Sequence, residues 1–125
     1  MSTSDQKFKA DAGKLQGRLL FEGMPRALKL AMAVLSYGAQ KYEAHSWRNV
    51  DVERYHDAKA RHMIDGVHEF ADKESGLWHK AHELVNLMFI IELETAGLRD
   101  DEFDQLLIYN KPPQDHKLDP EKEPC

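Results

Sequence analysis

The sequence predicts an all-α protein, an antiparallel helical bundle with three main helices and a short C-terminal helix. Apolar side chains recur at helical spacing in three long stretches, and turn-forming residues separate these stretches. No segment keeps the alternation of apolar and polar residues that a half-buried strand requires. We expect a single domain over residues 1–110 and an extended or disordered tail over residues 111–125, which are rich in proline and charge.

The composition restricts the classes of partner. The 125 residues include 17 lysines and arginines and 22 acids, for a net charge of −5. This balance argues against direct nucleic-acid binding, which needs a basic surface, but a bound metal could offset the charge of a nucleotide substrate. The single cysteine, Cys125, suits a reducing cytoplasm, and the longest apolar run, residues 30–35, is too short to cross a membrane. We expect a cytoplasmic protein with no membrane partner.

The first main helix is predicted over residues 25–43. Pro25 fits the first turn of a helix, because its missing N–H group has no partner there in any case. The apolar residues that follow at helical spacing are Leu28, Ala31, Met32, Leu35, Ala39 and Tyr42. Residues 1–23 are predicted to be irregular, with the apolar patch 19–21 packed onto the domain rather than forming a helix.

The second helix is predicted over residues 52–72. Asp51 is a good N-cap, and Glu53 suits the positive end of the helix dipole. Gly66 in the interior costs about 1 kcal/mol relative to alanine, which suggests close packing at that point. The apolar stripe expected to face the core is Ala60, Met63, Val67 and Phe70.

The third helix, residues 77–96, is the most apolar and is therefore expected to be central. Residues 72–76 are predicted to form the turn before it, with Ser75 and Gly76 at the end of that turn, and Gly97 suits the C-terminal cap of the helix. A short fourth helix is predicted over residues 100–109, with four apolar or aromatic side chains at Phe103, Leu106, Leu107 and Tyr109.

Two polar rows border the apolar faces of the second and third helices. Spacings of three, four and seven residues place the members of each row on one side of its helix. The rows are His62, Asp65 and Glu69 on the second helix, and His79, His82, Glu83 and Asn86 on the third. A short connection predicts that the helices pack as an antiparallel hairpin, which brings the rows together.

Such a group of side chains predicts a divalent-metal site. Carboxylate and amide oxygens suit Mg²⁺ or Mn²⁺, whereas imidazole suits Mn²⁺, Zn²⁺ or iron. For any single residue of the rows, a simple structural pairing of a histidine with an acid is the alternative interpretation. Two facing rows in so small a core favour a functional site, since buried acids and histidines are costly.

Two other segments offer chemistry. His56-Asp57, together with His45 and Asp104, could form the metal site of a His-Asp phosphohydrolase, although Asp57 also suits the helix dipole. In residues 37–48, Tyr42 or Trp47 could stack on a base, and Lys41 or Arg48 could contact phosphate. The alternative for Trp47 is that it only closes the core.

Several short motifs occur in a fixed order between residues 7 and 95. They are Asp11-Ala-Gly-Lys14, Tyr37-Gly-Ala-Gln-Lys-Tyr42, Trp47-Arg48, Ala60-Arg-His62, Ser75-Gly76, His79-Lys-Ala-His82 and Asn86-Leu-Met-Phe89. In this order they resemble the phage-associated family of dATP/dGTP diphosphohydrolase N-terminal domains, which is grouped with the MazG-like all-α nucleotide pyrophosphohydrolases. The resemblance implies a MazG-like fold and cleavage of a purine deoxynucleoside triphosphate to monophosphate and pyrophosphate with Mg²⁺ or Mn²⁺. The setting would be the cytoplasm of a bacterium infected by a phage.

Together, spacing and resemblance imply three sets of site residues. The substrate-binding residues would be Lys14, Lys41, Tyr42, Trp47 and Arg48. The metal-binding residues would be His62, Asp65, Glu69, His79, His82, Glu83 and Asn86. The catalytic residues would be Glu69, His79 and Glu83.

Two further expectations concern activity and assembly. Helix three carries Glu83-Leu-Val-Asn86 where MazG-like enzymes carry Glu-x-x-Asp, and an amide is a weaker ligand than a carboxylate. The alternative function is therefore a phage protein that binds or sequesters a nucleotide without hydrolysis. A homodimer is expected to complete the bundle, because three main helices leave the first one with little cover.

Overall fold

The computed structural model describes residues 14–110, with side chains as far as residue 107, and it confirms the all-α prediction. In chain order the elements are α2 (Gly17–Phe21), α3 (Pro25–Lys41), the 3₁₀ helix η1 (Ser46–Asn49), α4 (Val52–Asp65), α5 (His79–Thr95), α6 (Asp100–Asp104) and the 3₁₀ helix η2 (Gln105–Asn110). Within this described part, the β-structure is one isolated bridge between Ala71 and Trp78. No helix in the same residues is long and apolar enough to span a membrane.

The chain separates into two compact units, which we describe individually. One unit comprises residues 16–97 and holds α2, α3, η1, α4 and α5, while the other combines the residues up to 15 with those from 98 onward and holds α6 and η2. The predicted single domain over residues 1–110 stays a prediction. The predicted tail, residues 111–125, lies outside the described residues.

Helix α3 agrees with the predicted helix 25–43 to within two residues at its end. Pro25 occupies the first turn, and Lys41 lies in the last turn, where a cation complements the helix dipole. Ala31 and Val34 are its buried side chains, whereas Met32, a member of the predicted apolar row, is exposed. Leu30 of the same helix is partly buried and packs against this core.

Helix α4 begins as predicted but ends earlier. The Asp51 carboxylate accepts a hydrogen bond from the Glu53 N–H at 3.3 Å and so caps the first turn. The helix stops at Asp65 rather than at residue 72, so the predicted end is wrong. The backbone groups farther along are bonded to one another instead: Asp72 N–H donates to Leu77 O at 2.7 Å.

The predicted inward face of α4 is also wrong. Its apolar stripe faces solvent, since Ala60 and Met63 are exposed and the two residues beyond the helix, Val67 and Phe70, are 74% and 73% exposed. The face that packs against α5 carries Tyr55 and His62, whose rings contact Phe89 and His82. Ring stacking, rather than an aliphatic stripe, therefore holds these two helices together.

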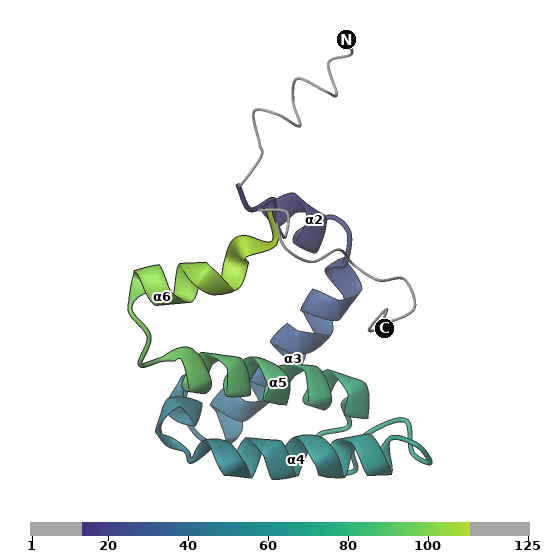
Figure 1. Cartoon of the computed structure of the whole chain (residues 1–125). Coiled ribbons are helices and arrows are strands. Elements are labelled where there is room, and N and C mark those ends of the chain that lie inside the picture. Colours follow the sequence, from purple (N-terminus) through teal and green to yellow (C-terminus); the bar gives the residue numbers. More distant parts are fainter. Residues whose placement is uncertain (1–13, 111–125) are drawn as a thin grey trace, which may run out of the picture. The chain divides into compact units, whose positions relative to one another are not determined.

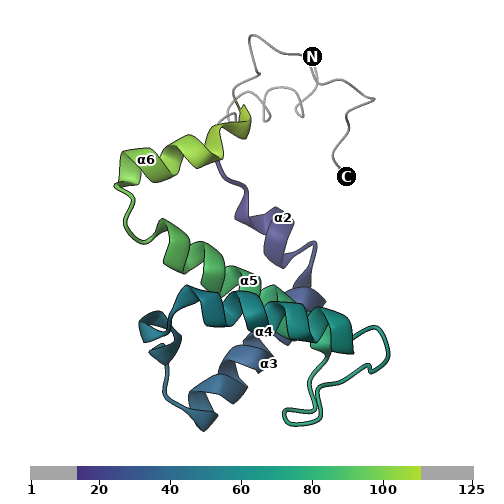
Figure 2. The ribbon, with the colours of Figure 1, turned by 60° about the horizontal axis from the view of Figure 1, so that its bottom comes forward.

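Helix α5 is central, as predicted, and its bounds lie within two residues of the predicted helix 77–96. Figures 1 and 2 both show α4 and α5 side by side and antiparallel, and α3 packs across α5. The core is a small cluster formed by Ala81 and Val85 of α5 with Ala31 and Val34 of α3. Val85, with 1% of its surface exposed, is the most deeply buried of these residues.

The two ends of the described chain are helical. Residues 17–21 form α2, with Leu19, Leu20 and Phe21 exposed, so the prediction of an irregular, packed segment is wrong there. In the other unit, the predicted helix 100–109 is α6 continued by η2. The backbone N–H of Arg99 donates to Glu102 Oε1 at 2.9 Å, which caps the start of α6.

Candidate functional site

The segment between α4 and α5 folds into a narrow hairpin. Asp72 N–H donates to Leu77 O at 2.7 Å, and His79 N–H donates to Phe70 O at 3.1 Å. Gly76 turns the chain with a φ of 75°, in the left-handed region that favours glycine. The hairpin thereby returns the chain so that Asp72 lies close to His79, the first residue of α5.

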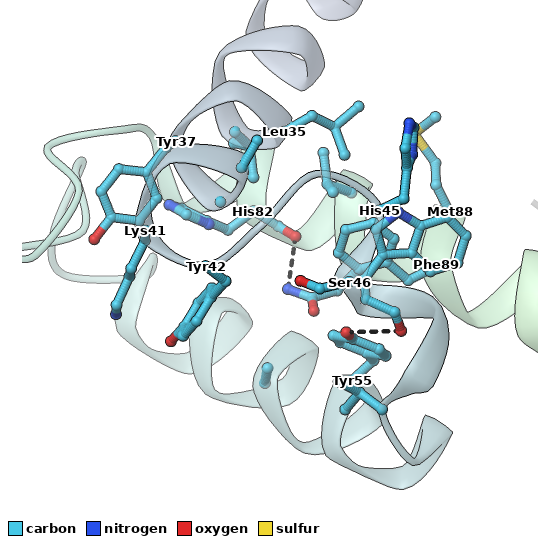
Figure 3. Close-up of a pocket in the computed structure, with 18 of the residues that line it drawn as sticks. Leu35, Tyr37, Lys41, Tyr42, His45, Ser46, Tyr55, His82, Met88 and Phe89 are labelled. Carbon is cyan, nitrogen blue, oxygen red and sulfur yellow. Dashed lines mark hydrogen bonds between the residues drawn. The ribbon is translucent and has the colours of Figure 1, made fainter.

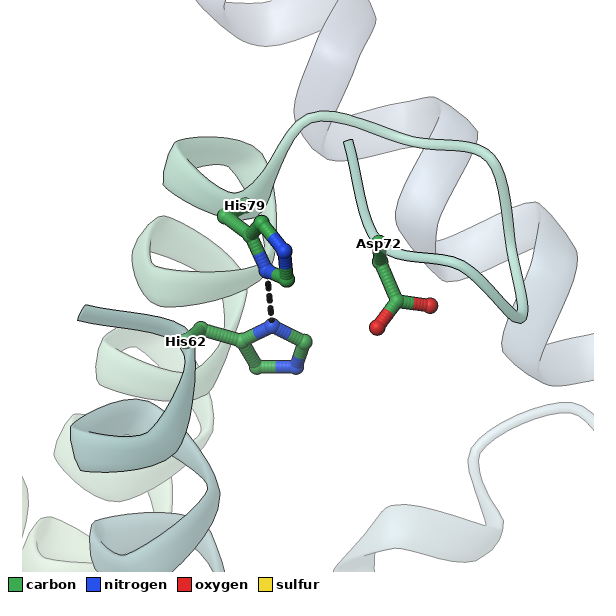
Figure 4. Close-up of side chains that lie close together, drawn as sticks. All are labelled: His62, Asp72 and His79. Carbon is green, nitrogen blue, oxygen red and sulfur yellow. Dashed lines mark hydrogen bonds between the residues drawn. The ribbon is translucent and has the colours of Figure 1, made fainter. Parts of the chain in front are cut away.

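His62, Asp72 and His79 form a compact group, which we call the histidine–aspartate group. One ligand atom of each residue lies within 4.8 Å of the other two. Figure 4 shows the rings of His62 and His79 facing each other through their Nδ1 atoms, 2.9 Å apart, with the Asp72 carboxylate beside them. Within residues 14–107, this is the group of three histidine, cysteine or acid side chains whose ligand atoms lie close enough together to hold a metal ion.

His82 and Ser75 hold this group from one side. The His82 ring stacks on that of His62, with centroids 4.4 Å apart and planes 6° apart. Ser75 Oγ lies 2.7 Å from His82 Nε2, and the backbone N–H of Ser75 donates to Asp72 Oδ2 at 2.8 Å. Ser75 therefore links the carboxylate of the group to the stacked histidines.

The environment favours neutral imidazoles beside an ionised carboxylate. Burial lowers the pKa of both His62 and His82 below the ordinary value for histidine. Burial raises the pKa of Asp72, but hydrogen bonds from Ser75 and the nearby His82 and His62 outweigh it, so the net pKa is lowered. These are the protonation states in which imidazole and carboxylate bind a metal ion.

The same shifts predict how the stability of the metal-free protein depends on pH. His62 and His82 bind protons more weakly in the folded chain than in the unfolded chain, where a histidine has a pKa of about 6.5. The free energy of unfolding should therefore fall as the pH drops through about 6.5, because the unfolded state takes up more protons. Asp72 should add a further loss at more acidic pH, near and below its unfolded pKa of about 3.9.

Thermal unfolding in the presence of a chelator, from pH 8 to pH 5, measures this dependence. A double variant, His62→Gln with His82→Gln, should show a flatter profile than the wild-type chain between pH 7 and pH 5. Identical slopes for the two proteins would contradict the assignment.

A cleft of about 1210 Å³ opens beside the histidine–aspartate group. Its walls come from the end of α3, from η1 and the residues around it, and from the facing sides of α4 and α5. In Figure 3, Tyr37, Lys41 and Tyr42 lie on one side of the cleft, and Met88 and Phe89 lie on the other. His62 and His82 both line the cleft, so it reaches the group directly.

Aromatic rings form one wall of the cleft. Trp47 stacks on Phe89, with centroids 4.7 Å apart, and the Tyr55 ring lies 4.9 Å from Phe89. The Tyr55 hydroxyl donates to Trp47 O at 3.1 Å and so fixes the loop. Trp47 therefore closes the core and lines the cleft at once, whereas Tyr42 is 70% exposed and available to stack on a ligand.

The cleft is positive although the whole chain is negative. Its charged lining residues are four cations, Lys41, Arg48, Arg54 and Arg61, and two acids, Glu43 and Glu92, a balance of +2 against −5 for the chain. The Arg48 guanidinium lies 5.5 Å from the Trp47 ring centre. Lys41 forms an ion pair with Glu74, which raises its pKa. A positive cleft attracts anionic ligands such as phosphates.

Two members of the row predicted on the second helix, Glu69 and Asp65, lie outside the histidine–aspartate group. Glu69 lies in the hairpin segment rather than on α4, with Lys73 Nζ 3.3 Å from Oε1 and His79 Nε2 3.5 Å from Oε2. The hydrogen bond from Lys73 is the largest cause of its lowered pKa. Asp65, in the last turn of α4, is exposed and outside the histidine–aspartate group.

The members of the row predicted on α5 do not all lie at the same place in the structure. Asn86 is buried, lines the cleft and donates an amide hydrogen bond to His82 O at 2.8 Å. Glu83 is half-buried and lies outside the histidine–aspartate group. Lys14 belongs to the unit that does not carry the cleft. The roles of these three residues stay predictions.

The residues of the alternative His-Asp site are not gathered into such a group. His56 Nε2 lies 3.1 Å from Glu94 Oε2, and Asp57 is exposed on α4. His45 lines the cleft, while Asp104 belongs to α6 in the other unit. Over residues 14–107, the side chains that lie close enough together to hold a metal ion are those of the histidine–aspartate group rather than those of the alternative site.

Sequence reasoning missed Asp72. We interpreted residues 72–76 as a turn, and Asp72 does accept the Ser75 N–H as a turn-forming aspartate does. The same carboxylate also faces two histidines. The available signal was its position, seven residues before His79 and in a segment between two histidine-bearing helices.

Comparison with known proteins gives two matches. The family model described as dATP/dGTP diphosphohydrolase, N-terminal, matches residues 4–103. A dATP/dGTP diphosphohydrolase of Salmonella phage PMBT28 is 39% identical over 70 residues, which are 55% of this chain and 24% of that protein. The alignment thus spans about a quarter of the length of that relative. No solved structure matches the chain.

Proposed function

Because the chain belongs to the family of dATP/dGTP diphosphohydrolase N-terminal domains, we propose that it hydrolyses a purine deoxynucleoside triphosphate to the monophosphate and pyrophosphate. The reaction uses a divalent metal ion, Mg²⁺ or Mn²⁺, and takes place in the cytoplasm of an infected bacterium. The observation that carries the proposal is a positive, aromatic-walled cleft that is lined by His62 of the histidine–aspartate group. The name of the phage relative supports the choice of substrate.

The cleft suits each part of such a substrate. Trp47 and exposed Tyr42, both of which line the cleft, offer aromatic surface on which a purine base can stack. Arg48, Arg54 and Arg61 line the cleft and can pair with phosphate oxygens. Lys41 is paired with Glu74 in this structure, so a phosphate would take the place of that carboxylate.

The chemistry is the addition of water across the bond between the α and β phosphates. A divalent ion, when bound, would offset phosphate charge and promote ionisation of the attacking water. The protein's own residues orient the substrate and supply the imidazole of His62, which lines the cleft, with the Asp72 carboxylate close to it. Attack breaks the phosphorus–oxygen bond of the bridge and releases monophosphate and pyrophosphate.

A screen of nucleotides tests the proposal. The purified chain is incubated with each of the four deoxynucleoside and four ribonucleoside triphosphates, with Mg²⁺ or Mn²⁺, and the products are separated by ion-pair chromatography. We expect dATP and dGTP to be converted to monophosphate and pyrophosphate, and a chelator to stop the reaction. If every nucleotide remains intact with both metals, the hydrolase is refuted, and nucleotide binding without turnover in calorimetry would identify the sequestering alternative.

We also propose that the chain forms a homodimer through the outer face of α4. The apolar side chains there are exposed: Met63, Ile64, and the following Val67 and Phe70. Exposed apolar side chains that gather on one surface are typical of an interaction site. Light scattering should give twice the 14.4 kDa mass of the chain, and Ile64→Glu should shift the mass toward that of one chain. A wild-type mass of 14.4 kDa would contradict the dimer.

A further inference from the structure

We infer that His62, Asp72 and His79 bind a first-row transition-metal ion, such as Mn²⁺, Co²⁺ or Zn²⁺, in preference to Mg²⁺, with Glu69 as the positioning residue of His79. The use of this ion in hydrolysis rests on the proposed function, whereas its binding does not. Neither the family match nor the phage relative assigns a metal ligand.

The donor atoms select the class of metal. The group offers two imidazole nitrogens and one carboxylate, and their ligand atoms lie within 4.8 Å of one another. Mg²⁺ prefers oxygen ligands and gives up its water reluctantly, whereas imidazole favours the later divalent ions. A mixed nitrogen and oxygen set therefore discriminates against Mg²⁺.

The two histidines already converge on one point. Their Nδ1 atoms are 2.9 Å apart, so a single proton lies between them in the metal-free chain. In the tautomers that carry the ring proton on Nε2, both Nδ1 lone pairs point into the same small space, which the Asp72 carboxylate borders (Figure 4). A cation is the natural replacement for the shared proton.

The far nitrogen of His79 supplies independent support. His79 Nε2 is buried and has no hydrogen-bond partner among the described residues, an arrangement that is costly in a folded protein. Its nearest acid is Glu69, whose Oε2 is 3.5 Å away. When Nδ1 binds a metal, Nε2 must carry the proton, and a carboxylate that accepts this proton orients the ring and raises its basicity.

The site is held in place before any ion arrives. Ser75 fixes the Asp72 carboxylate through its backbone N–H at 2.8 Å. Lys73 Nζ lies 3.3 Å from Glu69 Oε1, which leaves Oε2 toward His79. Gly66 lies directly behind His79, because a Cβ there would come within 3.1 Å of the His79 Cβ. A pre-organised site binds more tightly, because less order has to be created on binding.

Metal binding by the full chain, without nucleotide, tests this inference. The protein is stripped with a chelator and titrated with Co²⁺, followed by visible absorption, and with Mn²⁺, Zn²⁺ and Mg²⁺ in calorimetry. We expect one tightly bound transition-metal ion per chain and an affinity for Mg²⁺ at least about tenfold weaker. Asp72→Asn should lower the affinity for Co²⁺ by about tenfold or more, while circular dichroism shows that it remains helical.

The positioning role of Glu69 has its own readout. Glu69→Ala should weaken Co²⁺ binding by about tenfold, and Glu69→Gln should restore part of the affinity because its amide oxygen can still accept from His79 Nε2. His68→Ala, in the exposed turn after α4, is the matched control and should bind as the wild-type chain does. Equal Co²⁺ affinity for the alanine variant and the wild-type chain would remove Glu69 from the inference.

The outcomes separate this inference from the proposed function. Absence of Co²⁺ binding, or Mg²⁺ binding as tight as that of Mn²⁺, overturns the metal site even if a nucleotide is hydrolysed. Tight Co²⁺ binding that depends on Asp72, with no hydrolysis of any nucleotide, upholds the metal site and refutes the hydrolase.

Discussion

Replacement of His62 by alanine is expected to lower pyrophosphate release by at least about 100-fold while the chain remains folded. His62 borders the cleft, faces His79 at 2.9 Å and stacks on His82. Its loss removes one ligand of the proposed ion and also the ring on which His82 stacks. Loss of one supporting residue typically lowers activity by about 10- to 100-fold. Because His62→Ala removes a direct ligand and a supporting contact together, the loss of activity should be larger.

His68→Ala is the control for this variant, since His68 is an exposed histidine only six residues away. Steady-state assays with the best substrate from the nucleotide screen measure both proteins, and their melting temperatures show that both are folded. The fall should appear mainly in kcat, because the ring acts where the reaction takes place rather than where the base binds. A folded His62→Ala variant with wild-type kcat would place the reaction elsewhere in the cleft.

Gly66→Ala is expected to destabilise the chain by about 1–3 kcal/mol. A Cβ at this position would lie 2.9 Å from the His62 carbonyl oxygen and 3.1 Å from the His79 Cβ. The carbonyl oxygen belongs to the last turn of α4, so that turn would have to open, and the contact with His79 would push the end of α4 away from the start of α5. The close packing that the sequence suggests at Gly66 is confirmed.

Gly38→Ala is the matched control. Gly38 lies within α3, where a Cβ would meet no atom within 4 Å, so alanine should stabilise the chain by up to about 1 kcal/mol. Urea denaturation of the two variants and the wild-type chain gives the three free energies of unfolding. The packing argument fails if Gly66→Ala is as stable as Gly38→Ala.

Gly66→Ala should also weaken the binding of Co²⁺, since the added methyl group presses on His79. This second effect connects the packing of the hairpin to the site. A loss of stability with unchanged Co²⁺ affinity would show that the ring of His79 can adjust independently of its backbone.

Local patterns were sufficient to predict most helices. Pro25 and the apolar spacing that follows it locate α3, and the eight apolar residues among the ten of 84–93 identify α5 as central. The N-cap at Asp51 is also a local feature, because it depends on one side chain and the first turn of α4. The sequence also identified His62 and His79 as candidate ligands, and the structure brings the two together.

Which face of α4 turns inward was decided by tertiary structure. Periodicity shows that Met63, Val67 and Phe70 share a row, but it does not show what the neighbouring helix offers. Helix α5 presents Phe89 and His82, so the rings of Tyr55 and His62 pack there and the aliphatic row remains exposed.

The composition of the ligand group was decided in the same way. By itself, the sequence determined the helical class, the order of the helices and the histidine-bearing positions, because these depend on residues close together in the chain. Asp72, rather than Glu69, joins the two histidines in the ligand group, while Glu69 lies against the far nitrogen of His79. The hydrogen bonds of the hairpin, from Asp72 to Leu77 and from His79 to Phe70, replace the predicted last turns of α4. Helical periodicity treats residues 52–72 as one continuous helix, so it does not predict hydrogen bonds across a hairpin. Only the folded chain reveals them.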